Sequence, residues 1–110
     1  IISKLILTLL EYTSKFPQEY QLEKDALLGL IIHMSMAIPR WFQATGQENE
    51  NDQREYERIA EKHGVVYEIM EKFFELVENS LNVTIVAKER IAFFLYIILK
   101  EEISDESHDD

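Results

Sequence analysis

The chain has 110 residues, of which 21 are acidic and 11 basic, so its formal charge is −10 at pH 7. No cluster of Lys and Arg occurs, which argues against direct binding of nucleic acid or of an anionic membrane surface. Cysteine is absent, which excludes disulfides, thiol catalysis and thiolate metal sites. A chain of this length and apolar content forms one domain, which we expect in the reducing environment of the cytoplasm.

Turn-forming residues are few, with three glycines and two prolines, so a small number of long helices is favoured over many short strands. The longest apolar run, 91–99, is far below the roughly 20 residues that a membrane helix needs. The chain begins at Ile1 with no basic leader, and we expect it to be a domain excised from a longer protein. We therefore predict an all-α domain.

Apolar residues at helical spacing predict five helices, at 2–14, 22–40, 53–62, 65–79 and 87–102. Phe16 and Pro17 end the first helix, because the residue before a proline leaves the α region. Pro39 is expected to kink or end the second helix, because it lacks a backbone donor. A single helical domain over 1–103 is predicted, followed by an acidic tail or linker over 104–110.

The connections between these helices are predicted from local signals. The polar segment 43–52 is the one long loop and the expected site of mobility, with Asn51 or Asp52 capping the third helix. Gly64 is expected in the left-handed conformation that ends this helix, and His63 is expected to face water there. Segment 81–86 is predicted to be an extended link.

The second helix contains one imidazole, His33, within the nearly all-apolar stretch 29–41. Two lines of side chains follow its surface, an apolar core stripe and a thinner line of small residues that includes the histidine. The core stripe is Leu27, Ile31, Met34, Ile38 and Trp41, and the thinner line is Ala26, Gly29, His33, Ala37 and Arg40. Because the neighbours of His33 at four residues on either side are small, little bulk is expected over its ring. His33 is then either a packed core histidine, which is the commoner case, or a reactive group.

Most kinds of chemistry are disfavoured by the spacing of the polar residues. Ser35 lies two residues from His33 and points to another helix face, so no nucleophilic triad is expected. The three histidines, at 33, 63 and 108, lack metal-ligand spacing, and we predict no metal and no cofactor. The sequence shows no set of convergent polar groups of the kind that an enzyme's active-site pocket needs, so we predict that the domain is not an enzyme. A neutral imidazole at His33 could instead attack an activated phosphoryl group, with Arg40 as partner of the added charge.

The stretch LLGLIIHMSMAIPRW, with His33 and Arg40 at their spacing in an apolar helix, resembles the PTS regulation domain. This family occurs in bacterial transcriptional activators and antiterminators controlled by the sugar phosphotransferase system. The later stretches EYERIAEKHGVVYEIMEKFFELVENSLNVTI and ERIAFFLYIIL are similar to its paired helices, extended link and closing helix. The resemblance covers most of 22–99.

The resemblance implies a five-helix bundle of antiparallel pairs, dimeric, and phosphorylated on histidine by the phosphocarrier protein or a sugar-specific component. It implies that His33 is the phosphoacceptor and Arg40 a supporting residue. The sequence departs from the family at Ile32, where an acidic residue often stands, and at Tyr96 and Ile97, where a second histidine is common. These departures leave two hypotheses, a single-site switch and a degenerate dimerisation module. The second helix, apolar nearly all round, also predicts a homodimer.

Overall fold

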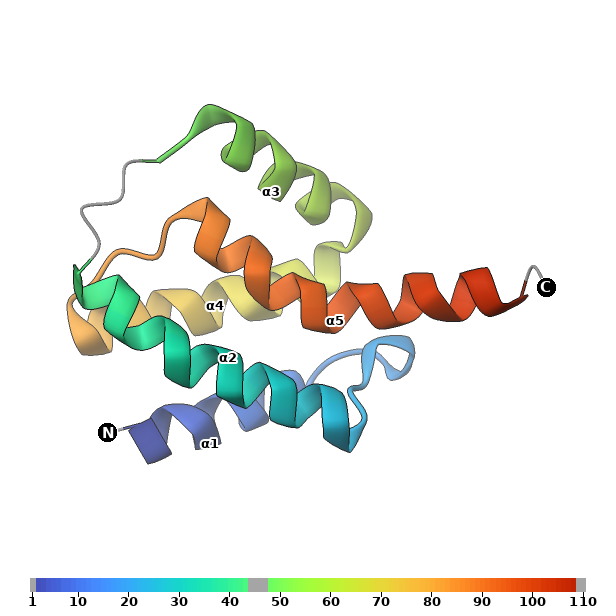
Figure 1. The fold of residues 1–110 in the computed structure, drawn as a ribbon, viewed down its shortest axis with the longest axis horizontal. Helices are drawn as coiled ribbons and strands as arrows, with labels where there is room; N and C mark the ends of the chain where they lie inside the picture. The colour runs from blue at the N-terminus through green and yellow to red at the C-terminus, as the bar shows by residue number, and fades with distance from the viewer. Residues whose placement is uncertain (1, 44–47, 109–110) are drawn as a thin grey trace.

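The computed structural model describes residues 2–43 and 48–108, and it describes side chains as far as residue 98. Five α-helices and one 3₁₀ turn follow one another along the chain (Figure 1). They are α1 (Ile2–Thr13), η1 (Gln18–Tyr20), α2 (Lys24–Gln43), α3 (Glu50–Lys62), α4 (Gly64–Leu81) and α5 (Ala87–His108). No strand occurs within these two ranges, and the predicted all-α fold is confirmed.

The helices form a bundle in which α2 and α5 pack against each other and run in opposite directions (Figure 1). Helix α1 packs on α4, and α3 packs on both α4 and α5. None of the helices, over the residues described, is long and apolar enough to cross a membrane.

Four phenylalanines form the centre of the core, Phe73 and Phe74 from α4 and Phe93 and Phe94 from α5, each at most 1% exposed. The Phe74 and Phe93 rings meet edge to face, with centroids 5.1 Å apart. Edge-to-face contact is the favoured geometry of an aromatic pair. The core therefore places α5 at the centre of the bundle, where it contacts α2 and α3.

Helix α2 continues through Pro39 to Gln43, so of the two predicted effects of this proline, a kink or the end of the helix, the second is wrong. A proline inside a helix costs about 3 kcal/mol. Trp41, two residues beyond, is only 3% exposed. Burial of an indole removes about 150–250 Å² from water, worth about 4–6 kcal/mol at about 25 cal/mol per Å². The burial of Trp41 outweighs the cost of Pro39.

The predicted caps of α3 and α4 are also corrected. Asn49, not Asn51 or Asp52, caps α3, because its side chain accepts the backbone N–H groups of those two residues. Gly64 is not left-handed but begins α4. The left-handed residue is Asn82, with φ 54°, at the end of α4. Asparagine tolerates this conformation better than most side chains, so it can end a helix as glycine does.

The predicted connections are reproduced in part. The link predicted over 81–86 is present as residues 82–86, which belong to no helix or strand. Of the predicted loop 43–52, residues 44–47 lie outside the described residues, while α2 and α3 each take part of the rest. Helix α5 is longer than expected, because its backbone is helical to His108, and residues 109–110 of the expected tail lie outside the described residues. A domain boundary after residue 103 stays a prediction.

Candidate functional site

The candidate site lies in the seam between α2 and α5, where the line of small residues on α2 faces the aromatic residues of α5. A Cβ atom built on Gly29 would lie 3.0 Å from Cε1 of Tyr96, so the tyrosine ring fills the notch that glycine leaves. Ala37, eight residues on, is fully buried. The small residues thus allow α5 to approach α2 closely, and they do not leave an open stripe.

The buried face of α2 is rotated toward this seam from the predicted core stripe. Its buried residues are Leu30, Met34, Ala37, Ile38 and Trp41. Leu27 and Ile31, expected in the core stripe, are only half-buried. The rotation places the small-residue side of α2 nearer to α5, where the Tyr96 ring lies against Gly29.

His33 is half-buried in this seam, and its ring packs against two rings of α5. The centroid of the imidazole is 5.0 Å from that of Phe93, with the planes at 82°, and 5.4 Å from that of Tyr96, with the planes at 41°. The expectation that little bulk covers the imidazole is therefore wrong. The covering side chains come from another helix, which the spacing of residues along α2 cannot reveal.

The two nitrogens of the His33 ring lie in different surroundings. Nε2 is buried and has no hydrogen-bond partner, the only such side-chain atom among the residues whose side chains are described. Nδ1 is not buried in this way, and it too makes no hydrogen bond to a described residue. Burial lowers the pKa of His33, and the nearby Arg40 charge lowers this pKa further, against an opposing effect of Glu89. The imidazole is therefore neutral at pH 7, the form in which it is a nucleophile.

Arg40 is held at the end of this seam by Glu89, in the first turn of α5. Its Nη2 donates to Oε1 of Glu89 at 2.8 Å and its Nε donates to Oε2 at 3.3 Å, a bidentate pair. Nε1 of Trp41 donates to the same Oε1 at 3.2 Å. Burial raises the pKa of Glu89, but the hydrogen bonds from Arg40 and Trp41 outweigh it, so the net shift of this pKa is downward. Glu89 stays ionised and joins α2 to α5.

The sequence did not single out Glu89 as a site residue. Its only local signal is an acidic side chain in the first turn of a helix, where the helix dipole favours a negative charge. Many solvent-facing helices begin in the same way, and the partner of Glu89 lies 49 residues away in the chain. The sequence therefore predicted Arg40 as a site residue but not the carboxylate that holds it.

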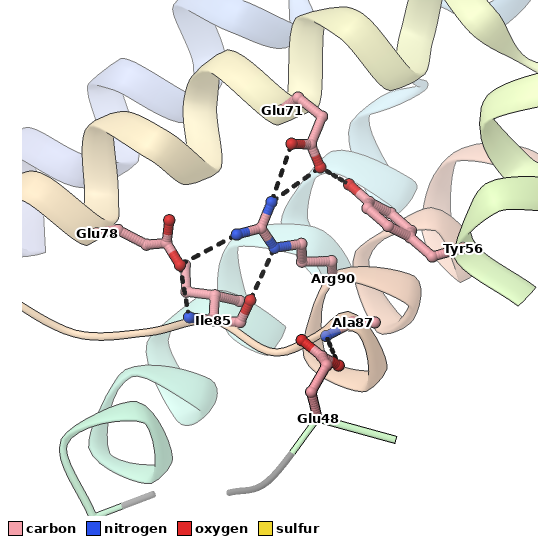
Figure 2. Close-up of polar contacts among 7 residues, drawn as sticks. All are labelled: Glu48, Tyr56, Glu71, Glu78, Ile85, Ala87 and Arg90. Carbon is pink, nitrogen blue, oxygen red and sulfur yellow. Dashed lines mark hydrogen bonds and ion pairs between the residues drawn. The ribbon is translucent and has the colours of Figure 1, made fainter. Parts of the chain in front are cut away.

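The beginning of α5, which carries Glu89, is held in place by Arg90 (Figure 2). The guanidinium donates to both carboxylate oxygens of Glu71, at 2.8 and 3.0 Å, and to Oε2 of Glu78 at 3.0 Å. Its Nε donates to the backbone oxygen of Ile85 at 2.7 Å, and the Tyr56 hydroxyl donates to Glu71. This network ties α3, α4 and α5 together.

A carboxylate also satisfies the backbone at the start of α5. Oε1 of Glu48 accepts the N–H of Ala87 at 2.9 Å (Figure 2). A helix N-terminus leaves such N–H groups without partners inside the helix. The first turn of α5 is therefore fixed relative to the rest of the bundle, and the position of Glu89 opposite Arg40 follows from it.

His63 does not face water as predicted. Its Nδ1 shares a hydrogen bond of 2.7 Å with the Tyr20 hydroxyl, and the residue is half-buried. It lines a cavity of about 240 Å³ between α3 and α5, together with Phe94 and Ile98. The third histidine, His108, lies beyond the described side chains. Among the residues that the structure describes, no group of three His, Asp or Glu side chains could hold a metal ion.

Comparison with known proteins gives one match. A family model described as the PRD domain matches residues 8–101, which is most of the chain. Comparison with curated proteins and comparison with solved structures each gave no match. The matched residues include the whole α2–α5 seam, with His33, Arg40 and Glu89.

Proposed function

The chain belongs to the PTS regulation domain (PRD) family, whose members are regulatory domains, and from this premise we propose that it is a phosphorylation switch in a bacterial transcription regulator. The phosphotransfer system's phosphocarrier protein, or a sugar-specific component, donates a phosphoryl group to His33 in the cytoplasm. The observation that supports this proposal is a neutral imidazole held in the α2–α5 seam beside an Arg40–Glu89 ion pair.

The phosphoryl group brings roughly two negative charges into this seam, close to the Arg40–Glu89 ion pair. At an effective dielectric constant of about 20, two like unit charges about 6 Å apart repel each other by about 3 kcal/mol. The new charge competes with Glu89 for the Arg40 guanidinium and repels the Glu89 carboxylate. Either effect weakens the contact between α2 and the beginning of α5. Phosphorylation therefore acts by loosening this seam.

Dimerisation through the outer face of α2 is part of the proposal. Large apolar side chains repeat there every four residues, with Leu28 47%, Ile32 57% and Met36 66% exposed. Such a stripe, contiguous along one helix face, is typical of a surface that packs against a partner. The occupant that we propose is α2 of a second copy. Because the same helix carries His33, a change in the seam can reach the dimer interface directly.

A second candidate is a degenerate helical dimerisation module in which His33 is only packed. Two observations favour it. Arg40 is already engaged by Glu89, and Tyr96 occupies the seam beside His33 at a place where the family often has a second histidine. In this case the chain keeps the fold and the dimer contact without the phosphoryl transfer.

Phosphotransfer separates the two candidates. The domain is incubated with phosphoenolpyruvate, the general phosphotransferase enzyme and its phosphocarrier, with and without sugar-specific components, and its intact mass is followed. We expect one acid-labile phosphate in the wild type and in the control variant His63→Gln, and none in His33→Gln. No phosphate from any donor would reject the switch in favour of the degenerate module. Equal labelling of His33→Gln would reject His33 as the site.

A further inference from the structure

We propose that the phosphoryl group is accepted by Nδ1 of His33, and that Phe93 and Tyr96 direct it there by holding a proton on Nε2. This inference rests on the proposed phosphorylation of His33 and adds which atom reacts. Phe93 and Tyr96 are positioning residues in this account, because they act on the imidazole and not on the phosphoryl group.

Access to the two nitrogens differs. Nε2 is buried, and the ring that carries it packs against Phe93 and Tyr96 of α5, so a phosphorus atom could reach Nε2 only if the packing around this ring opened. Tyr96 cannot shift toward α2 to make room, because its ring already lies 3.0 Å from the place where a Gly29 Cβ would be. Nδ1 is neither buried nor hydrogen-bonded to a described residue. In the packed bundle only Nδ1 is open to a donor.

The same packing sets the tautomer of the imidazole. A neutral imidazole carries a proton on one nitrogen and a lone pair on the other. Nε2 is buried in a ring that packs against two aromatic rings, Phe93 and Tyr96. A lone pair buried beside negative π clouds is disfavoured, whereas an N–H is attracted to such a ring. The nearly perpendicular Phe93 ring, at 82°, suits this contact. The proton therefore resides on Nε2, and the lone pair that makes the ring nucleophilic is on Nδ1.

The transfer step balances without a further base. The lone pair of Nδ1 attacks the phosphorus of the donor's protonated phosphohistidine, and the new N–P bond forms as the donor's N–P bond breaks. The electron pair of the broken bond returns to the donor nitrogen, which leaves a neutral histidine on the donor. His33 becomes a protonated phosphohistidine that keeps its proton on Nε2, so its contacts with Phe93 and Tyr96 survive the step.

Long-range ¹H–¹⁵N NMR correlations of the ¹⁵N-labelled domain test the inference, because they distinguish the two tautomers and the two phosphohistidine isomers. In the unmodified domain we expect the proton on Nε2, and after labelling through the phosphocarrier we expect the Nδ1 isomer in at least tenfold excess. Phosphate on Nε2 of the wild type would overturn the inference and leave the proposed function standing. An Nδ1–H tautomer would also overturn the inference. No phosphate on His33 would reject the proposed function, and the inference with it.

Two variants test the role of Tyr96. Tyr96→Phe keeps the ring and should keep the wild-type isomer, whereas Tyr96→Ala opens a path to Nε2 and should give a mixture of isomers. A purely structural role for Tyr96 would alter stability without altering the isomer ratio. An unchanged ratio in folded Tyr96→Ala would therefore overturn the positioning role. If Tyr96→Ala does not fold, Tyr96→Leu, which fills the space without an aromatic face, replaces it.

Discussion

Replacement of Arg90 by methionine tests whether the network at the start of α5 holds the bundle together. The Arg90 side chain is 17% exposed and bridges Glu71, at 32%, and Glu78, at 24%. Arg90→Met keeps the apolar stem of the side chain but removes the charge and all of its donors. Two partly buried carboxylates would then face each other without their shared cation.

The expected loss follows from the burial of these groups. Removal of one partner of a buried ion pair costs about 3–5 kcal/mol. Water reaches both carboxylates in part, so we expect a smaller loss of about 2–3 kcal/mol in the free energy of unfolding. For a domain of this size each kcal/mol lowers Tm by about 4–8 °C, so Arg90→Met should lower Tm by roughly 8–24 °C.

Thermal unfolding followed by circular dichroism, with urea unfolding beside it, measures this loss. Lys88→Met is the matched control, because Lys88 is exposed in the same turn of α5 and should change the free energy by no more than about 0.5 kcal/mol. If Arg90→Met unfolded within a few degrees of Lys88→Met, the network would not be what fixes the start of α5. A second variant, Glu71→Gln in the Arg90→Met background, should recover part of the loss, because it removes one unpaired charge.

Three further predictions concern α2. Folding lowers the pKa of His33 below its usual value of 6.5. The contribution of His33 to stability is therefore complete above about pH 6.5 and is lost as the pH falls through the pKa of the folded state. In urea unfolding, the wild type should lose more stability on acidification than His33→Gln. Gly29→Ala should gain nothing in a wild-type background, yet should gain about 1 kcal/mol in a Tyr96→Ala background, where no ring opposes the new Cβ. Ile32→Glu should convert the proposed dimer to a monomer in sedimentation velocity, whereas Val65→Glu, on an equally exposed valine of α4, should not.

The fold class was predictable because its signals are local. Apolar periodicity marks each helix within its own segment, and all five predicted helices are present, although their ends differ. The helix ends differ from the predicted ones where a contact with a distant part of the chain outweighs the local preference of the sequence. Pro39 would end an isolated helix, but the burial of Trp41 in the core extends it. The sequence pattern indicates the free-energy cost of a proline inside the helix, but it does not indicate the free energy gained when Trp41 is buried in the core.

The candidate site was predictable only in its α2 half. His33 and Arg40 stand out because a lone imidazole and a lone guanidinium interrupt an apolar helix. Their surroundings come from α5, and nothing in the order of residues along either helix states that Tyr96 fills the notch at Gly29 or that Glu89 meets Arg40. These contacts depend on how two helices are rotated against each other. The seam had to be seen in the folded chain.

The most direct test of the proposed switch is amide hydrogen exchange of the domain before and after phosphorylation of His33. If the phosphoryl group loosens the α2–α5 seam, amides in the first turns of α5 and in the facing part of α2 should exchange about tenfold faster, which corresponds to about 1.4 kcal/mol of local stability. Amides where α1 packs on α4 should be unchanged. Identical protection of the seam in the phosphorylated and unmodified domains would contradict the switch.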